Sequence, residues 1–429
     1  MSDAIVITPP MPRERAVEIA STLDLRALPP DFYANPYPAY SHLRETEPVK
    51  HLPDGSYFLS RHADLVAVYR DAQTFSSDKK VEFTPKYGAG SALLEHHTTS
   101  LVFNDPPLHT RVRKPIMGAL TRRAIDQMQP GLVLLVDSLL DRIDTNGGGD
   151  LIEDFASAIP VEIIGNLLGV PHEDRAPLRG WSLAILGALE PKLTPEQESL
   201  GNHSVVEFTA YLKQLVAERR KHPGDPEQDV LTRLIHGEAS GEKLSEPELL
   251  QNCVFILNAG HETTTNLIGN ALASLHEWPR ERESLIAKIR AAANEPEAQE
   301  AFMTPAVDEF LRFESSNQLG NRRAVRACEV GGVQLEAGAL VTLCIGAANR
   351  DPAQFNEPET LVLTRENNRH LAFGFGIHQC AGLSLARLEG RIAIARFLAR
   401  FPGYRLTQSP TRGGRARFRG FLKAPFAIS

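Results

Sequence analysis

The sequence predicts a mainly α-helical protein with a small β-rich region. A long helix is indicated by Ser245 and Glu248, which form a capping-box pattern at its start, and by Pro279, which ends it. A second helix is expected directly after Cys380, where apolar residues recur at helical spacing. Runs with β propensity are few and short, at residues 56–60, 330–346 and 418–428.

Composition sets the broad class. The chain has 429 residues, and its 42% hydrophobic and 23% charged content is typical of a globular protein. We expect one domain over residues 1–429, with residues 1–25 as an extended N-terminal segment, because no stretch is long enough for a linker. The net charge of −7 gives no reason to expect a nucleic acid as partner.

The cysteines and the hydropathy pattern indicate a location. Four dispersed cysteines without a CxxC pair argue against a disulfide framework and a zinc site, and favour a reducing compartment. The N-terminus lacks the apolar run of a signal peptide. No stretch approaches the roughly 20 apolar residues of a membrane span. We therefore expect a cytoplasmic protein without a membrane anchor.

The middle of the long helix reads NAGHETTT (258–265), which is a poor helix sequence. Gly260 costs about 1 kcal/mol relative to alanine, and threonines lower helix propensity further. One interpretation is a crossing point for another helix. The other is a helix opened to admit a ligand, with Glu262 and Thr263 routing protons as an acid–alcohol pair.

Two charged motifs lie elsewhere in the chain. EFLR places Glu309 and Arg312 at i,i+3, so they share a helix face. HTRVR places His109 and Arg113 at i,i+4, on a helix interrupted or kinked at Pro115. Taken alone, each pattern is more typical of an exposed, solvated face than of a site.

The stretch FGFGIHQCAG (373–382) places Cys380 in a glycine-rich turn before a helix. A helix N-terminus stabilises a thiolate, which acts as a nucleophile or as a metal ligand. His378 could serve as a base for a nucleophile, but no oxyanion arrangement is evident. Glycines that let the backbone approach a flat body favour the alternative, a single thiolate ligand on a planar iron cofactor.

Together these motifs resemble the cytochrome P450 superfamily in its soluble bacterial form. FGFGIHQCAG is similar to its heme-binding signature, EFLR to its E-x-x-R motif and AGHETT to its oxygen-activation motif. Segments from residue 35 to residue 376 also resemble family segments in the same order. The resemblance implies the P450 fold, with heme b (iron protoporphyrin IX) between the long central helix and the helix after the cysteine ligand.

The resemblance also implies roles for individual residues. Cys380 would be the proximal iron ligand, favouring O–O cleavage. Glu262 and Thr263 would organise water and deliver protons, while Ala259 and Gly260 leave room above the iron. The remaining cofactor-binding positions are Phe373, Gly376 and Gly382, together with four partners of the heme propionates, His109, Arg113, Arg322 and His378.

Two further expectations concern neighbours of these positions. Arg323 could take the place of Arg322 if the register slipped by one residue. Glu309 and Arg312, with Arg365 as third member, would form a buried structural network. Ser316 stands where the family often has a proline, which alters the pocket-lining segment.

The implied activity is that of a monooxygenase. It would insert one oxygen atom from O2 into a small to medium, largely apolar organic substrate by hydroxylation or epoxidation, as in secondary metabolism. Electrons would come from a separate ferredoxin or flavodoxin with an NAD(P)H-dependent reductase. Alternatives are use of peroxide, oxidative coupling or rearrangement, a non-catalytic heme-binding sensor, and a structural helical protein without heme.

Substrate-contacting residues follow from helical spacing and from the altered segment. Segments 83–100 and 181–203 are expected to roof the pocket. Asn258 and Gln318 suggest a polar group on the substrate, although core amides explain them equally well. The predicted lining is Phe255, Asn258, Ala259, Gln318 and Gly320.

Overall fold

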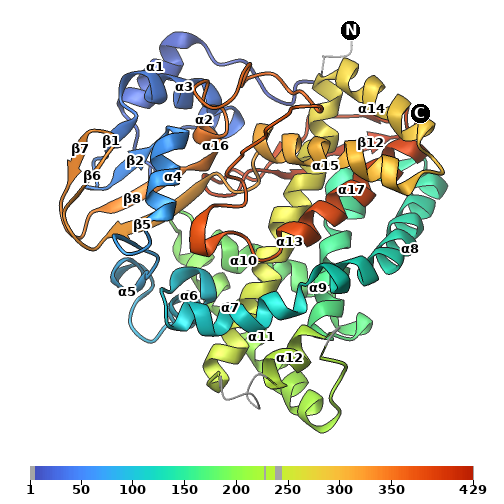
Figure 1. Cartoon of the computed structure of the whole chain (residues 1–429), viewed down its shortest axis with the longest axis horizontal. Coiled ribbons are helices and arrows are strands. Elements are labelled where there is room, and N and C mark those ends of the chain that lie inside the picture. Colours follow the sequence, from blue (N-terminus) through green and yellow to red (C-terminus); the bar gives the residue numbers. More distant parts are fainter. Residues whose placement is uncertain (1–4, 227–228, 237–243, 429) are drawn as a thin grey trace.

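A body of helices surrounds one long central helix, α13 (Glu246–Glu277), and a smaller β-rich region lies to one side (Figure 1). The computed structural model describes residues 5–226, 229–236 and 244–428. This architecture confirms the mainly α prediction with a small β region.

The N-terminal part contains α1 (Arg13–Ser21), α2 (Pro30–Ala34), α3 (Tyr37–Thr46) and α4 (His62–Arg70). The expectation of an extended segment over residues 1–25 is therefore wrong for the part that forms α1. The physical reason is amphipathicity, because Ile19 and Ala20 of α1 are buried in a cluster that also contains Tyr40 and Leu43 of α3.

A second group of helices covers α13. α7 continues through Pro115, so of the two predicted outcomes, an interruption or a kink, the interruption does not occur. Short 3-10 turns lie at Leu101–Phe103 and His172–Asp174, and a π-helical turn at Leu151–Ala156. The helices are α5 (Lys80–Tyr87), α6 (Ala92–Thr99), α7 (Leu108–Ala119), α8 (Arg122–Asn146), α9 (Ala158–Leu168), α10 (Leu178–Gly187), α11 (Pro195–Lys221) and α12 (Val230–His236).

The central helix begins as predicted and is continuous. Ser245 and Glu248 form a reciprocal capping box, with 2.8 Å between the Ser245 amide nitrogen and Glu248 Oε2. The helix does not open at its glycine. A Cβ on Gly260 would come within 2.5 Å of Ile164 Cδ1 on α9, so the small residue permits a close helix crossing there.

The chain then forms α14 (Pro279–Ala291), α15 (Pro296–Phe313) and α16 (Ile345–Ala348). A 3-10 turn at Gly376–His378 leads into α17 (Leu383–Arg400), the predicted helix after Cys380. α17 packs against α8, α13 and α15, which fixes the cysteine-bearing turn relative to the central helix.

The β-rich region is built around a five-stranded sheet in the order β1-β2-β8-β5-β3. β5 and β8 pair antiparallel, with Leu319 opposite Cys344, whereas β2 and β8 are parallel. β4, β12 and β9 form a second sheet, and β6–β7 and β10–β11 form two hairpin-like pairs. The strands are β1 (Val49–His51), β2 (Tyr57–Leu59), β3 (Phe75–Ser76), β4 (Gly148–Asp150), β5 (Leu319–Ala324), β6 (Cys328–Val330), β7 (Val333–Leu335), β8 (Leu340–Cys344), β9 (Arg405–Leu406), β10 (Thr411–Arg412), β11 (Phe421–Lys423) and β12 (Pro425–Ala427).

The C-terminal segment 412–419 runs back along the site and carries four arginines that contact distant parts of the chain. Its main chain pairs with the segment before β5, because Gln318 donates its amide to Arg417 O at 2.8 Å. Arg419 donates its amide to Ser316 O at 2.9 Å. This pairing places arginine side chains beside both the central helix and β5.

Candidate active site

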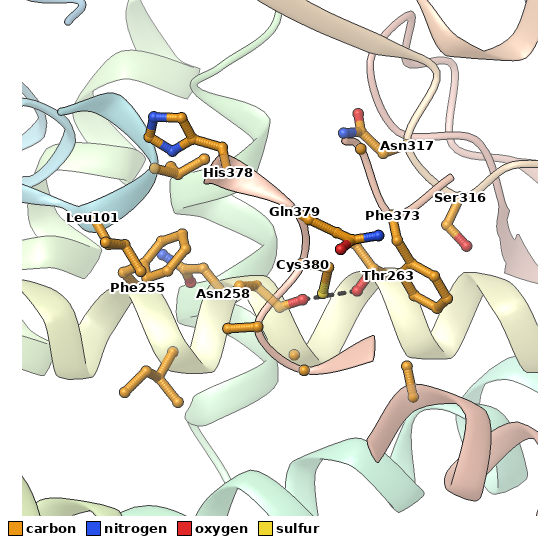
Figure 2. Close-up of a pocket in the computed structure, with 18 of the residues that line it drawn as sticks. Leu101, Phe255, Asn258, Thr263, Ser316, Asn317, Phe373, His378, Gln379 and Cys380 are labelled. Atoms are coloured by element: carbon orange, nitrogen blue, oxygen red, sulfur yellow. Dashed lines mark hydrogen bonds between the residues drawn. The ribbon is translucent and has the colours of Figure 1, made fainter. Parts of the chain in front are cut away.

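A large cavity of about 340 Å³ lies between α13, the turn that carries Cys380 and strand β5 (Figure 2). Its lining comes from segments that are far apart in sequence, including α6, α13, β5, the Cys380 turn and the C-terminal segment. Most lining side chains are apolar, as expected for a small-molecule site. Cys380 and Thr263 both line this cavity.

The turn before α17 holds Cys380 in place through its own backbone. The Cys380 amide donates to Phe373 O at 2.9 Å, and the Gln379 amide donates to Gly376 O at 3.0 Å. Gly376 has a φ of 72°, and a Cβ there would collide with the carbonyl oxygen of Tyr69. The glycine is therefore required by the turn and by close approach to α4.

Burial raises the pKa of the Cys380 thiol, and this effect outweighs the lowering by the Gly382 backbone N–H, Arg113 and Arg387. The predicted stabilisation of a thiolate by the helix N-terminus is thus present but is not the largest effect. A buried sulfur of this kind becomes a thiolate when it binds a cation, since a coordinating thiol is deprotonated. The donor set, one thiolate on a glycine-containing turn, fits an iron porphyrin.

The nucleophile alternative finds no support in the geometry. Within residues 5–226, 229–236 and 244–428 no hydrogen bond joins Cys380 to an imidazole. The His378 ring instead packs on His109, with 4.2 Å between the ring centroids. Burial, and then the charge of Arg322, lower the pKa of His378 to about 2.

The four residues expected to hold the heme propionates lie together at one side of the cavity. Both ring nitrogens of His109 and the Nε2 of His378 are buried and find no hydrogen-bond partner among the described residues. Arg113 donates to Gln379 O at 2.6 Å, and Arg322 donates to Asn321 O at 2.8 Å. Buried donors that lack a partner are costly, so this arrangement fits an anionic group such as a porphyrin propionate.

The two neighbouring arginines of β5 point to different places. Arg322 lines the cavity and lies over the Tyr69 ring, 5.2 Å from its centroid. Arg323 pairs with Glu82 at 3.1 Å and donates to Gly338 O at 2.6 Å. Alternation of side chains along a strand explains the difference. The structure therefore selects Arg322 over Arg323 as the cavity-facing cation.

The acid–alcohol pair is divided between two cavities. Thr263 lines the large cavity and donates its hydroxyl to Ala259 O at 2.7 Å. Glu262 lines a separate cavity of about 20 Å³ together with His261 and Arg415. Glu262 Oε1 lies 2.6 Å from Arg415 Nη1, while Oε2 has no hydrogen-bond partner. Burial raises the pKa of Glu262, and Arg415 opposes that shift.

The EFLR motif forms a buried network rather than an exposed pair. Glu309 and Arg312 are both 0% exposed, with 2.7 Å between Glu309 Oε2 and Arg312 Nε. Arg365 Nε lies 3.0 Å from the same carboxylate oxygen. Arg312 also donates to the carbonyl oxygens of Asn349 and Thr360, which ties α15 to the long loop before the Cys380 turn.

Four of the five predicted substrate-contacting residues line the large cavity, namely Phe255, Asn258, Ala259 and Gly320. Gln318 does not, so that prediction is wrong. Its side chain donates to Ser315 O at 2.7 Å and packs directly on Gly346 of α16. Ser316 does line the cavity, as expected for the altered segment.

Sequence reasoning missed two histidines in the roof of the cavity. His96 and His97 of α6 are 2% exposed and line it, within the segment 83–100 that was expected to form the roof. His96 Nδ1 lies 3.0 Å from Gln251 Oε1, and Asn258 Nδ2 lies 3.4 Å from His96 Nε2. The only signal in the sequence was the pair of adjacent histidines in EHHTT. Leu186 and Leu189 represent the other roof segment, 181–203.

A cysteine-bearing turn that faces a threonine on a long helix, beside two buried histidines and two arginines, defines a heme-thiolate site. The family model for cytochrome P450 matches residues 186–411. Cytochrome P450 107B1 from Saccharopolyspora erythraea is 34% identical over 400 residues, covering 90% of this chain and 93% of the relative. The chain belongs to the cytochrome P450 family, and it is a heme b-binding monooxygenase.

Other relatives and solved structures agree. The biotin biosynthesis cytochrome P450 of Bacillus subtilis is 34% identical over 379 residues, covering 88% of this chain and 91% of the relative. A vitamin D(3) 25-hydroxylase from Pseudonocardia autotrophica is 35% identical over 385 residues, covering 86% of this chain and 87% of the relative. The crystal structure of P450BioI in complex with a hexadec-9Z-enoic acid ligated acyl carrier protein has a TM-score of 0.85 at 31% identity. That match covers 93% of this chain and 99% of the other.

In the described ranges no helix is both long enough and apolar enough to cross a membrane.

Proposed function

We propose that the protein inserts one oxygen atom from O2 into a small to medium, largely apolar organic substrate, by hydroxylation or epoxidation. The observation that carries the proposal is that Cys380 and Thr263 line one mostly apolar cavity. Cys380 would hold a bound heme through its thiolate, and the heme would supply the activation of O2. The electrons come from a ferredoxin or flavodoxin and its NAD(P)H-dependent reductase.

The chain's own residues divide the remaining tasks. His109, Arg113, Arg322 and His378 would hold the heme propionates. Ala259 and Gly260, two small residues of α13 that line the cavity, would leave space for the group beside the helix. Thr263 presents a hydroxyl group to the cavity. Glu262 lies behind the helix, paired with Arg415. Burial raises its pKa and Arg415 opposes that rise, so the carboxylate can take up a proton and release it again.

We also propose that residues 1–429 act as a single catalytic domain in the cytoplasm. All four cysteines are free, which suits a reducing compartment.

The proposal is tested with Cys380→Ser and, as a matched control, Cys328→Ser on strand β6 outside the cavity. We expect the wild type and Cys328→Ser to show the strongly red-shifted Soret band of a ferrous–CO thiolate complex. Both should incorporate one atom of ¹⁸O2 into product when supplied with a surrogate ferredoxin and reductase. Cys380→Ser should lose both signals. An unchanged CO spectrum in Cys380→Ser contradicts the assignment.

A second candidate, turnover driven by hydrogen peroxide, is favoured by one observation. The ion pair with Arg415 holds the Glu262 carboxylate outside the large cavity, so proton delivery from it is indirect. Product formed with hydrogen peroxide alone, at a rate above that with O2 and reduced ferredoxin, would select this candidate.

A further inference from the structure

Arg417 brings a positive charge into the lining of the large cavity. Its Nη1 donates to Leu319 O at 2.8 Å, and its Nη2 donates to the side-chain oxygen of Asn321. Both acceptors are neutral. Its Nε is buried without an acceptor, and among the residues that the structure describes no carboxylate forms an ion pair with it.

The other arginines of the same segment differ in this respect. Arg412 and Arg419 both pair with Glu314, and Arg415 pairs with Glu262. Glu190, the acidic group that interacts most with Arg417, accepts backbone amides from Ala416 and Arg417 at 2.8 and 3.2 Å. Counting carboxylates in the described part of the chain, Arg417 is thus the one arginine of segment 412–419 without an ion-pair partner.

Two amino groups, those of Lys79 and Lys86, lie close enough to Arg417 to be affected by its charge. Burial lowers the pKa values of Lys79 and Lys86 to about 7, and the charge of Arg417 contributes to both shifts. Lys79 Nζ is buried and has no hydrogen-bond partner in the part of the chain that the structure describes. Its carboxylate neighbour Glu82, at 3.7 Å, is shared with Arg323. Cations gathered in a partly desolvated place are costly unless an anion joins them.

We propose that Arg417 binds the carboxylate of an amphipathic organic acid, whose apolar part lies along Phe255, Leu186 and Leu189. The planar guanidinium fork matches a carboxylate in two parallel hydrogen bonds. The inference rests on the proposed function, because it names the substrate class of the same cavity. The proposed role of Arg417 is separate from heme binding, to which the proposed function assigns His109, Arg113, Arg322 and His378.

The binding of a carboxylate by Arg417 is tested by calorimetric titration of the heme-loaded protein at pH 7.5, which measures the affinities of matched acid and alcohol ligands. The pairs are dodecanoic acid with 1-dodecanol and 4-phenylbutanoic acid with 4-phenyl-1-butanol, so that chain shape does not decide the outcome. We expect at least one acid to bind about tenfold more tightly than its alcohol, as a charge-assisted bidentate contact provides. Arg417→Gln should reduce that ratio to about one while leaving alcohol affinity within about twofold.

Arg323→Gln is the matched control. Arg323 is a nearby arginine that pairs with Glu82, but its side chain does not line the cavity. This variant should keep the acid preference. The proposal is overturned if no acid is preferred by the wild type, or if Arg417→Gln keeps the preference. It is also overturned if Arg417→Gln only accelerates heme loss. The ferrous–CO spectrum and ¹⁸O2 incorporation are recorded in parallel, so a failure of the monooxygenase proposal is seen independently.

Discussion

Glu262 and Arg415 form an ion pair behind the central helix, with 2.6 Å between Glu262 Oε1 and Arg415 Nη1. The pair joins the midpoint of α13 to the C-terminal segment and turns the carboxylate away from the cavity that Thr263 lines. Removal of Arg415 leaves the Glu262 carboxylate buried without a counter-charge, and removal of Glu262 leaves the Arg415 cation without its partner.

This pair predicts a strong energetic coupling. Arg415→Gln should destabilise the protein by about 3 kcal/mol, because it leaves the Glu262 carboxylate buried without a counter-charge. The double variant Arg415→Gln/Glu262→Gln should recover at least about 1 kcal/mol of this loss. Urea unfolding of the four proteins in the cycle measures the coupling, and additive losses would show that the pair does not stabilise the fold.

Thr263 is expected to control how efficiently electrons are used. Thr263→Ala should bind substrate as the wild type does, but product per NAD(P)H consumed should fall by about tenfold or more, with hydrogen peroxide released instead. Thr263→Ser keeps the hydroxyl and should retain most of the coupling. Full coupling in Thr263→Ala would exclude the hydroxyl from proton delivery.

The network around Glu309 should be essential to the fold. Arg312→Gln should cost about 3–5 kcal/mol of unfolding free energy, since it leaves a fully buried carboxylate without its main partner. Arg365→Gln should cost less, because Arg312 still compensates Glu309. Chemical denaturation and heme retention measure the difference. Equally small losses of unfolding free energy in the two variants would contradict the prediction that Arg312 contributes more than Arg365.

Arg322 and Arg323 offer a matched test of heme binding. Arg322→Gln should accelerate heme transfer to apomyoglobin by roughly 10- to 100-fold, the effect of one lost charge-assisted contact. Arg323→Gln, whose partner is Glu82, should leave the transfer rate nearly unchanged. The opposite ranking would mean that the register of β5 is shifted.

Glu389 on α17 predicts a dependence of stability on pH. It is 2% exposed, its Oε2 has no partner, and burial raises its pKa to about 8. The folded state therefore binds more protons than the unfolded state between about pH 4.5 and 8, so this group's stabilisation is full below that window and is lost as the pH rises through it.

The unfolding free energy should fall by up to about 1.4 kcal/mol per pH unit in that window. Glu389→Gln has nearly the same shape and no charge, so it should flatten the profile in urea titrations from pH 5 to 8. A variant with the wild-type slope would assign the pH dependence to other groups.

Features with a local cause could be predicted from the sequence. The capping box of Ser245 and Glu248 depends on four residues, and the turn around Cys380 depends on its own glycines. The α13 spacing was sufficient to place Phe255, Asn258 and Ala259 at the cavity. The capping box and the helical spacing needed no knowledge of distant packing.

Features made by contacts between distant segments could not be predicted in this way. The orientation of Gln318 is determined by Gly346, which leaves room for its amide beside α16. The partner of Glu262 comes from Arg415, 153 residues later in the chain, and no spacing rule links the two. His96 and His97 become roof residues only because α6 packs across α13.

The arginine-bearing segment 412–419 has a consequence for biosynthesis. Synthesis at roughly 5–20 residues per second delivers α13 and the Cys380 turn well before this segment leaves the ribosome. Until then Glu262 lacks its counter-charge, Glu314 lacks two of its cations, and the wall beside β5 is open. A nascent chain that ends near residue 410 would carry Cys380 without a closed chamber around it.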